Sequence, residues 1–167
     1  MLEYPLLLVF PVAMIYAAVM DLFTMTIPNR ISLALIVGFF AAAAFSGLGW
    51  VEVAKHAGAG ALVLTCTIAM FSQGWIGGGD AKLLAAVSLW FGFDNLLDYV
   101  VVAALFGGLL TMLILSYRQF IPSVMIGGHD WAERLHDKKG GVPYGIALGA
   151  AGLWIFPKSQ IFLAFAA

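Results

Sequence analysis

Two aspartates lie in apolar segments where an acidic side chain is unexpected. Asp21 occurs in MIYAAVMDLFTMTIPN, and Asp80 follows three glycines in IGGGDAKLLAA. A charge at the centre of a membrane helix costs about 2.5–3.5 kcal/mol, so such acids usually face the protein interior and carry function. Two carboxylates about 3 Å apart cannot both ionise, and they share one proton. One can then take a proton from water while the other protonates a carbonyl oxygen, as in an aspartic protease.

The segment before Asp80 contains Gly77, Gly78 and Gly79. Each glycine weakens a helix interior by roughly 1 kcal/mol. Glycine also permits unusual backbone angles and close approach by a second backbone. We therefore weigh two interpretations of this segment. It either shapes a site that holds an extended peptide, or it forms a tight turn with close helix packing.

Three further residues flank the two aspartates. Lys82 is expected either to extend toward the membrane interface or to pair with Asp80. Pro28 suits the first turn of a helix, because its missing N–H costs little there. Asn29 is interpreted as a helix cap or a turn residue, and all three are candidates for shaping the site.

The composition predicts an integral membrane protein with a single domain over residues 1–167. Of these residues 63% are hydrophobic and 10% are charged, whereas a soluble domain is nearer half apolar and a quarter charged. The net charge is −1 and no basic cluster exceeds Lys138-Lys139, which argues against a nucleic-acid partner. The single cysteine, Cys66, cannot form an internal disulfide or a zinc cluster.

An all-α bundle of six transmembrane helices is predicted, because one span needs roughly 20 mainly apolar residues. The fourth helix is short, about 21 Å long, and is expected to begin in a polar cavity or to thin the membrane. The N-terminal segment lacks the features of a cleaved signal peptide and is interpreted as a retained span. The G-x-x-x-G in the last span predicts close helix packing within the chain. The approximate spans are 4–22, 31–50, 57–75, 80–93, 96–117 and 143–165.

Polar segments and tryptophans mark the expected membrane boundaries. The longest polar segment, 118–142, is predicted to be a cytoplasmic loop between the fifth and sixth spans, with a short helix at DWAERLHDKK. His56 is assigned to a loop on the opposite side. Trp50, Trp75 and Trp90 are interpreted as anchors at the membrane interface.

The placement of lysine and arginine predicts the orientation. The loop after the second span and the end of the last span carry only Lys55 and Lys158. We therefore expect the other three loops in the cytoplasm and both termini outside. Asp21 and Asp80 then lie on the cytoplasmic side at a similar depth, which predicts a shared site. The cytoplasmic positive charges are Arg30, Lys82, Arg118, Arg134, Lys138 and Lys139.

Three motifs resemble those of the type IV prepilin peptidases. GGGDAKLLAA resembles their GxGD-x-K-L-x-A motif, and DLFTMTIPN resembles their first-aspartate motif, an acid followed by I-P-N. VPYG at 142–145 resembles their C-terminal P-Y-G element. Motif order and spacing match over essentially the whole chain. The short form, with little before the first helix, is similar to the CpaA/TadV subgroup that serves tight-adherence (Flp) pili.

This resemblance implies a GxGD-type aspartic endopeptidase of the bacterial inner membrane. It would remove the leader of prepilins or pseudopilins at the cytoplasmic face, just before their hydrophobic helix, without metal or other cofactor. Asp21 and Asp80 would be the catalytic pair, and Pro143, Tyr144 and Gly145 would shape the site. Expected partners are the prepilin peptide, the lipid bilayer and the pilus assembly machinery. Larger members carry a cysteine-containing domain and N-methyltransferase activity, and its absence here predicts peptidase activity only.

Other functions remain open at this point. Presenilin-like and signal-peptide-peptidase enzymes also contain GxGD, but they have a tyrosine where this chain has Met20 and a P-A-L element where it has PYG. A small transporter can relay ions through buried acids, but it would need polar residues that the second and third spans largely lack. A scaffold protein leaves the two acids unexplained. His129 and His136 have weak metal-site spacing and are expected on a solvated face.

Overall fold

The computed structural model describes residues 3–122, 128–138 and 140–166. In these ranges every residue belongs to a helix, a turn or a loop, which confirms the predicted all-α fold for this part of the chain. Residues 123–127 and Lys139, which belong to the predicted long loop, lie outside the described residues.

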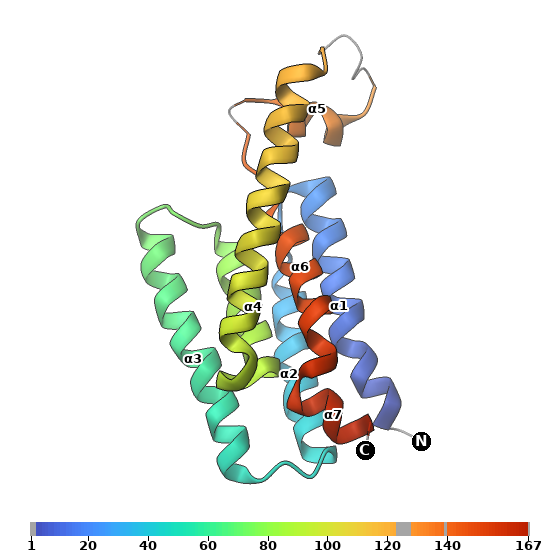
Figure 1. The fold of residues 1–167 in the computed structure, drawn as a ribbon, viewed down its shortest axis with the longest axis vertical. Coiled ribbons are helices and arrows are strands. Elements are labelled where there is room, and N and C mark those ends of the chain that lie inside the picture. The colour runs from blue at the N-terminus through green and yellow to red at the C-terminus, as the bar shows by residue number, and fades with distance from the viewer. Residues whose placement is uncertain (1–2, 123–127, 139, 167) are drawn as a thin grey trace.

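The first three helices pass up, down and up along the molecule (Figure 1). They are α1 (Glu3–Thr24), α2 (Asn29–Phe45) and α3 (Trp50–Ser72). The turn after α2 contains Gly47 at φ 72°, a left-handed conformation that glycine adopts without strain. Because α2 ends there, α3 begins well before the predicted third span. The segment around His56 is therefore helical, and its prediction as a loop is wrong.

The helix α4 (Gly78–Phe120) reverses direction at Gly92, whose φ of 57° and ψ of −168° are not helical. We call the part before Gly92 the short arm and the part after it the long arm, and the two run in opposite directions (Figure 1). The ring centroids of Phe91 and Tyr99 lie 4.9 Å apart, whereas a continuous helix would separate these positions by about 12 Å. The arms correspond to the predicted fourth and fifth spans, but the break precedes the predicted link at 94–95.

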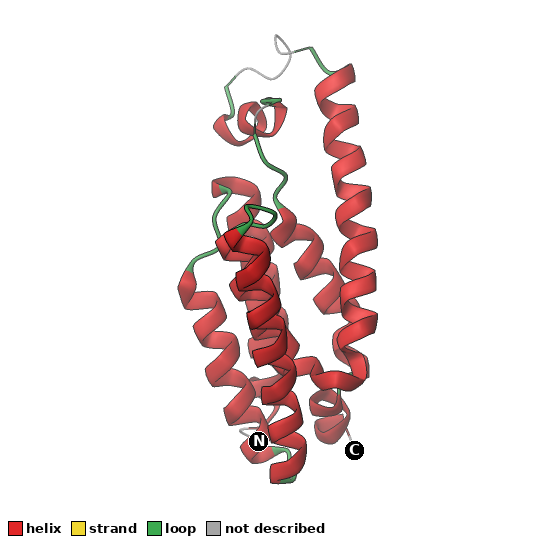
Figure 2. Cartoon of the chain, turned by 90° about the vertical axis from the view of Figure 1, so that its left-hand side faces the viewer, coloured by secondary structure: helices red, strands yellow, loops and turns green. Residues whose placement is uncertain are grey.

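The remaining helices are α5 (Asp130–His136), α6 (Tyr144–Ile155), the 3-10 helix η2 (Phe156–Lys158) and α7 (Gln160–Ala166). The helix α5 confirms the short helix predicted in the long loop, and it lies beyond the end of the bundle, by the end of the long arm (Figure 2). The helix α6 packs on both α1 and α4. A bend of 47° separates it from α7, so the segment containing Pro157 forms a kink.

Small residues let these helices approach closely. Packing of this kind matters in a membrane, where lipid tails are as apolar as leucine and the hydrophobic effect does not drive helices together. A Cβ at Gly149 would lie 2.9 Å from the carbonyl oxygen of Met14 in α1, so the G-x-x-x-G prediction of close packing within the chain is confirmed. An aromatic cluster joins α1, the short arm and η2 in the core, and it consists of Phe10, Trp90, Phe91 and Phe156.

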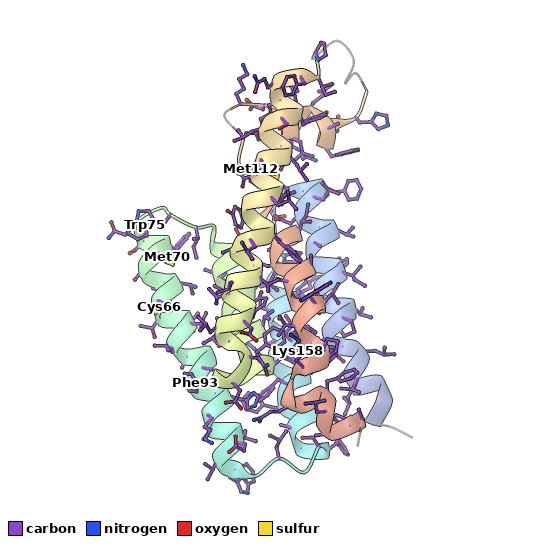
Figure 3. All side chains as sticks on the ribbon, in the orientation of Figure 1. Cys66, Met70, Trp75, Phe93, Met112 and Lys158 are labelled. Carbon is purple, nitrogen blue, oxygen red and sulfur yellow. The ribbon has the colours of Figure 1, made fainter. Side chains whose placement is uncertain are left out.

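Two residues predicted at polar boundaries lie in the core instead. Trp90 is 0% exposed, and its Nε1–H donates to a carbonyl oxygen of α2 at 2.9 Å. His56 is 2% exposed, and its Nδ1 lies 2.6 Å from a carbonyl oxygen of the short arm. Both predictions are wrong because neighbouring helices cover these positions, with α2 packed on Trp90 and the short arm of α4 on His56. Trp50 and Trp75 are exposed, and Trp75 projects from the α3–α4 connection (Figure 3).

In the part of the chain that the structure describes, three helices are long and apolar enough to cross a membrane, namely α1 from Leu6 to Thr24, α3 and α4. The bent pair of α6–η2 and α7 adds a fourth candidate, and α2 is apolar but shorter, at 17 residues. The reversal at Gly92 divides the α4 candidate, and its short arm measures roughly 21 Å. The described residues thus support the membrane class, while the count of six spans stays a prediction.

Candidate active site

Three helix ends meet at one end of the bundle: the C-terminus of α1 and the N-termini of α4 and α6 (Figure 1). Asp21 lies in the last turn of α1, which ends before Met25 adopts φ 54°. Asp80 lies in the first turn of α4, whose N-cap is Gly77. Because α1 and the short arm run in opposite directions, both aspartates lie at this same end.

Asp21 is held by the start of α6. The residue is 6% exposed, and its Oδ2 accepts a hydrogen bond from the backbone N–H of Gly145 at 2.7 Å. A Cβ at position 145 would lie 2.8 Å from both the Cβ and the Oδ2 of Asp21. Only glycine therefore lets the N-terminus of α6 come this close. The partial positive charge of this helix N-terminus favours the carboxylate form of Asp21.

Asp80 presents an unpaired oxygen in the same region. The residue is half-buried, and its buried Oδ1 has no hydrogen-bond partner among the described residues. An unsatisfied buried acceptor costs about 1–3 kcal/mol, and such groups in native proteins call for an explanation such as catalysis or a bound water. The Oδ1 atom thus lacks a hydrogen-bond donor, which a water molecule or a substrate group that reaches the carboxyl group would supply.

Both aspartates line one cavity of about 440 Å³. Its walls come from the end of α1, the α1–α2 connection, the end of α3 and the start of α4. Two carboxylates facing one cavity can hold a water molecule and exchange protons with a bound peptide. Seven of the lining residues are among the predicted site residues. The full lining is Asp21, Met25, Thr26, Ile27, Asn29, Phe71, Gly77, Gly78, Gly79, Asp80 and Lys82.

The chain matches the model of the type IV leader peptidase family over residues 8–112, which is more than half of its length. It belongs to the type IV leader peptidase family. The matched range includes both aspartates and the three glycines, and it ends before the P-Y-G element. The predicted resemblance to this family is therefore confirmed, and the chain is assigned to a class of membrane peptidases. No curated protein sequence and no solved structure matches it significantly.

The three glycines of this leader-peptidase family member serve close packing. Gly77 has φ −71° as the N-cap, and Gly78 and Gly79 already belong to α4. A Cβ at Gly79 would lie 3.2 Å from the Cβ of Ile27, and one at Gly77 would lie 3.1 Å from Asp80 Oδ2. The prediction of unusual backbone angles is wrong here, because the segment is an ordinary helix N-terminus. Close packing is thus present, while the interpretation that the glycines hold an extended peptide stays a prediction.

Lys82 takes a polar partner that was not predicted. Its Nζ donates to the Oδ1 of Asn29 at 3.0 Å, which links the start of α4 to the start of α2. Pro28 is the N-cap residue of α2, and no side chain caps that terminus. The predicted capping role of Asn29 is therefore wrong, and its side chain borders the cavity together with Lys82.

In the P-Y-G element, Gly145 is the residue bonded to an aspartate. Pro143 is the buried N-cap of α6. The ring of Tyr144 packs on the long arm of α4 against Gly107. Neither Pro143 nor Tyr144 is among the described residues that line the cavity. The two residues instead help to determine where α6 begins, and thus where the Gly145 N–H lies.

Three lining residues carried no signal in the sequence that pointed to a site: Met25, Thr26 and Phe71. A fourth, Ile27, belongs to the I-P-N motif but was not among the predicted site residues. Met25 has a φ of 54°, and the left-handed conformation costs a residue with a Cβ roughly 1–2 kcal/mol. The only available hint for Met25 and Thr26 was their position between Asp21 and I-P-N. Phe71 comes from α3, and only the packing of α3 beside the start of α4 places it here.

Two arginines attach the long loop to the site end of the bundle. Arg118 donates through Nε to the carbonyl oxygen of Leu135 at 2.6 Å and through its guanidinium to that of Gly141 at 2.9 Å. Arg134 donates to the carbonyl oxygen of Phe23 in α1. The helix α5 is thereby held close to the end of α1. Among the described residues, no group of three or more metal-ligating side chains gathers.

Proposed function

We propose that this protein is a GxGD-type aspartic endopeptidase that removes the leader peptide of Flp/Tad-type prepilins. The observation that carries the proposal is that Asp21 and Asp80, from two separate helices, line one cavity. Membership of the type IV leader peptidase family supports the substrate class. The whole chain, residues 1–167, is proposed to form one peptidase domain, since α6 packs on both helices that carry the aspartates.

The proposed reaction uses one water molecule and the two carboxyl groups, one ionised and one protonated. The ionised group takes a proton from water as the water oxygen attacks the scissile carbonyl carbon, and the other group protonates the carbonyl oxygen. When the C–N bond breaks, the leaving amine takes the proton held by the first group. As the diol formed at the former carbonyl carbon becomes a carboxylic acid, one of its two hydroxyls returns a proton to the second group. The pair thereby regains its starting state.

Peptidase activity alone is proposed, without N-methyltransferase activity. The connection between α1 and α2 comprises only residues 25–28, which leaves no room for an inserted domain. The chain contains one cysteine, so it lacks the paired cysteines of larger members. Both features support the short CpaA/TadV-like subgroup.

We further propose that the site faces the cytoplasm across the bacterial inner membrane, with both termini outside. Arginine and lysine favour the cytoplasmic side of membrane proteins. Several of them lie at the same end of the bundle as the aspartates, which supports this orientation, and a cytoplasmic site would also face the pilus assembly machinery. These residues are Arg30, Lys82, Arg118 and Arg134.

The test is cleavage of a co-expressed Flp-type prepilin, observed as a leader-sized shift on a gel. Wild type, Asp21→Asn and Asp80→Asn are compared at equal membrane levels. We expect wild type to cleave and each variant to lose about 10³-fold or more in rate, because the two acids act as a unit. Asp98→Asn, an exposed aspartate that borders neither aspartate of the pair, is the matched control and should retain activity.

Persistent cleavage by either site variant would reject the two-carboxylate mechanism. A wild type that cleaves no Flp-type prepilin would reject the substrate assignment. Equal loss in Asp98→Asn would show that removal of any aspartate impairs the protein, and the pair would then have no special role.

A further inference from the structure

A second cavity, of about 510 Å³, adjoins the aspartate cavity and shares Asn29 and Lys82 with it. It lies between α2, α3 and the short arm of α4. We call it the lateral groove. Its polar side chains lie in the first turns of α2 and α4, toward the aspartates, and its remaining walls are glycine, alanine, leucine and isoleucine. The groove is therefore polar at the site end and apolar along its length.

We propose that the lateral groove binds the apolar helix of the prepilin, so that the peptide bond preceding this helix enters the aspartate cavity. This inference rests on the proposed function, because it assigns a binding surface to the substrate of that reaction. It adds which helices hold the substrate and from which side of the bundle the substrate enters.

The groove is open at the side of the bundle. The helices α2 and α3 both pack on α4, whereas direct packing between α2 and α3 is minor. The side chains that form its rims remain accessible: Leu33 is 61% exposed, Ile36 37% and Leu64 41%. In a bilayer this opening faces the lipid, so an apolar helix can enter sideways without leaving the membrane.

The depth of the groove depends on small residues. A Cβ at Gly60 of α3 would lie 2.7 Å from Leu89 of the short arm, so glycine lets these two helices touch at the base. Ala61 and Ala85 line the groove next to this contact. Their short side chains leave the space that the side chains of a docked helix would fill, and such van der Waals packing is what holds helices together in lipid.

The polar end of the groove fits the peptide segment at the cut. The groove follows α2 from Asn29 to Ile36, which corresponds to about two turns or 10 Å of helix. At the end of the groove nearest the aspartates, the substrate segment that precedes the docked helix reaches Lys82 and Asn29, which are hydrogen-bonded to each other. These side chains can exchange this bond for hydrogen bonds to the substrate backbone, which must be extended to meet the aspartates.

The first arm of the test compares two probes. One is a full-length Flp-type prepilin, and the other is a soluble peptide that contains the leader and the cut site but ends before the apolar helix. Ala61→Trp fills the groove from an exposed position, and Ala69→Trp places the same bulk on an exposed position of α3 that borders neither cavity. We expect Ala61→Trp to lower the ratio of kcat/KM for prepilin over peptide about tenfold or more. Ala69→Trp should leave this ratio unchanged.

The second arm does not depend on cleavage. A photoreactive benzoylphenylalanine replaces Leu33 in the groove or Leu62, which is exposed on α3 outside the groove. Both variants also carry Asp80→Asn, so that the prepilin is not cleaved before it is crosslinked. We expect a crosslink to the prepilin from position 33 and not from position 62. Crosslinks only to lipid or to a second copy of this chain, or equal crosslinks from both positions, would overturn the groove assignment. An unchanged prepilin-to-peptide ratio in Ala61→Trp would do the same.

The two proposals fail in different ways. If wild type cleaves prepilin but position 33 gives no specific crosslink, the groove is wrong and the proposed function stands. If position 33 crosslinks prepilin specifically but wild type cleaves nothing, the groove is retained as a prepilin-binding surface and the proposed function is wrong.

Discussion

The two aspartates differ in their surroundings. Asp21 accepts a backbone hydrogen bond from Gly145, and bonds of this kind to a carboxylate are short and strong. The Oδ1 of Asp80 has no such partner among the described residues. One carboxyl group is thus fixed in orientation, while an oxygen of the other lacks a hydrogen-bond donor that water or substrate would supply. This asymmetry suits a pair in which the two acids hold a single proton in turn.

Gly145→Ala tests the positioning of Asp21. Its Cβ would fall 2.8 Å from Asp21, so α6 or the carboxylate must move, and a displacement near 1 Å at an active site can cost about 10²-fold in rate. We expect kcat for prepilin cleavage to fall by about that factor. Gly108→Ala on the long arm is the control, since a Cβ there meets nothing within 4 Å, and it should keep full activity.

Thermal unfolding in detergent accompanies both glycine variants. If Gly145→Ala were fully active at an unchanged melting temperature, the contact between α6 and Asp21 would have no catalytic importance. If Gly108→Ala lost activity to the same extent, the effect would belong to glycine replacement in general.

At the scale of the elements, the reversal at Gly92 gives the short arm its length and places Asp80 near the end of α1. The turn is packed against His56, whose Nε2 lies 3.2 Å from Oε1 of Gln160 in α7. Gln160 in turn donates to Asp94 at the start of the long arm. This polar network extends from the buried His56 to the exposed Asp94, and it joins α3, α4 and α7 at the end of the bundle opposite the aspartates. The network stabilises the reversal of α4, and this reversal positions the short arm that carries Asp80.

Gly92→Ala is expected to destabilise the protein by about 1–3 kcal/mol, because a residue with a Cβ is strained at this positive φ. The new Cβ would also lie 3.0 Å from the ring of His56. Gly47→Ala is the control, since Gly47 has a similar φ of 72° but open space around it. Chemical unfolding in detergent should show a larger loss for Gly92→Ala than for Gly47→Ala. Equal losses would mean that the contact with His56 contributes nothing.

At the scale of the whole molecule, the orientation in the membrane decides which substrates the site can meet. Cysteine labelling tests it in a Cys66→Ser background with a membrane-impermeant maleimide added to intact cells. Gly49→Cys lies in the α2–α3 connection, at the end opposite the aspartates, and Gln73→Cys lies at the C-cap of α3, at the aspartate end. Both positions are exposed, so their labelling reports the side of the membrane.

We expect maleimide to label Gly49→Cys in intact cells and to label Gln73→Cys only after the membrane is made permeable. The opposite pattern would place the aspartates outside, and the proposal of cleavage at the cytoplasmic face would then be wrong. Labelling of both positions in intact cells would show that the two connections do not lie on opposite sides.

The sequence by itself determined the membrane class, the all-helical fold and the peptidase family. Composition and the spacing of apolar segments are local properties, and the motifs around Asp21 and Asp80 are contiguous in the chain, so both can be read without coordinates. The same local signals marked seven of the residues that line the cavity. They failed where the outcome depended on a neighbour, as with the burial of Trp90 and His56.

Only the tertiary structure decided which groups surround the aspartates. The N–H of Gly145, the ring of Phe71 and the hydrogen bond between Lys82 and Asn29 all come from segments far apart in the chain. The lateral groove likewise exists because α2 and α3 pack on the short arm rather than closely on each other. Such arrangements follow from how helices fit together, and side-chain packing between distant segments leaves no periodic or local pattern in a sequence.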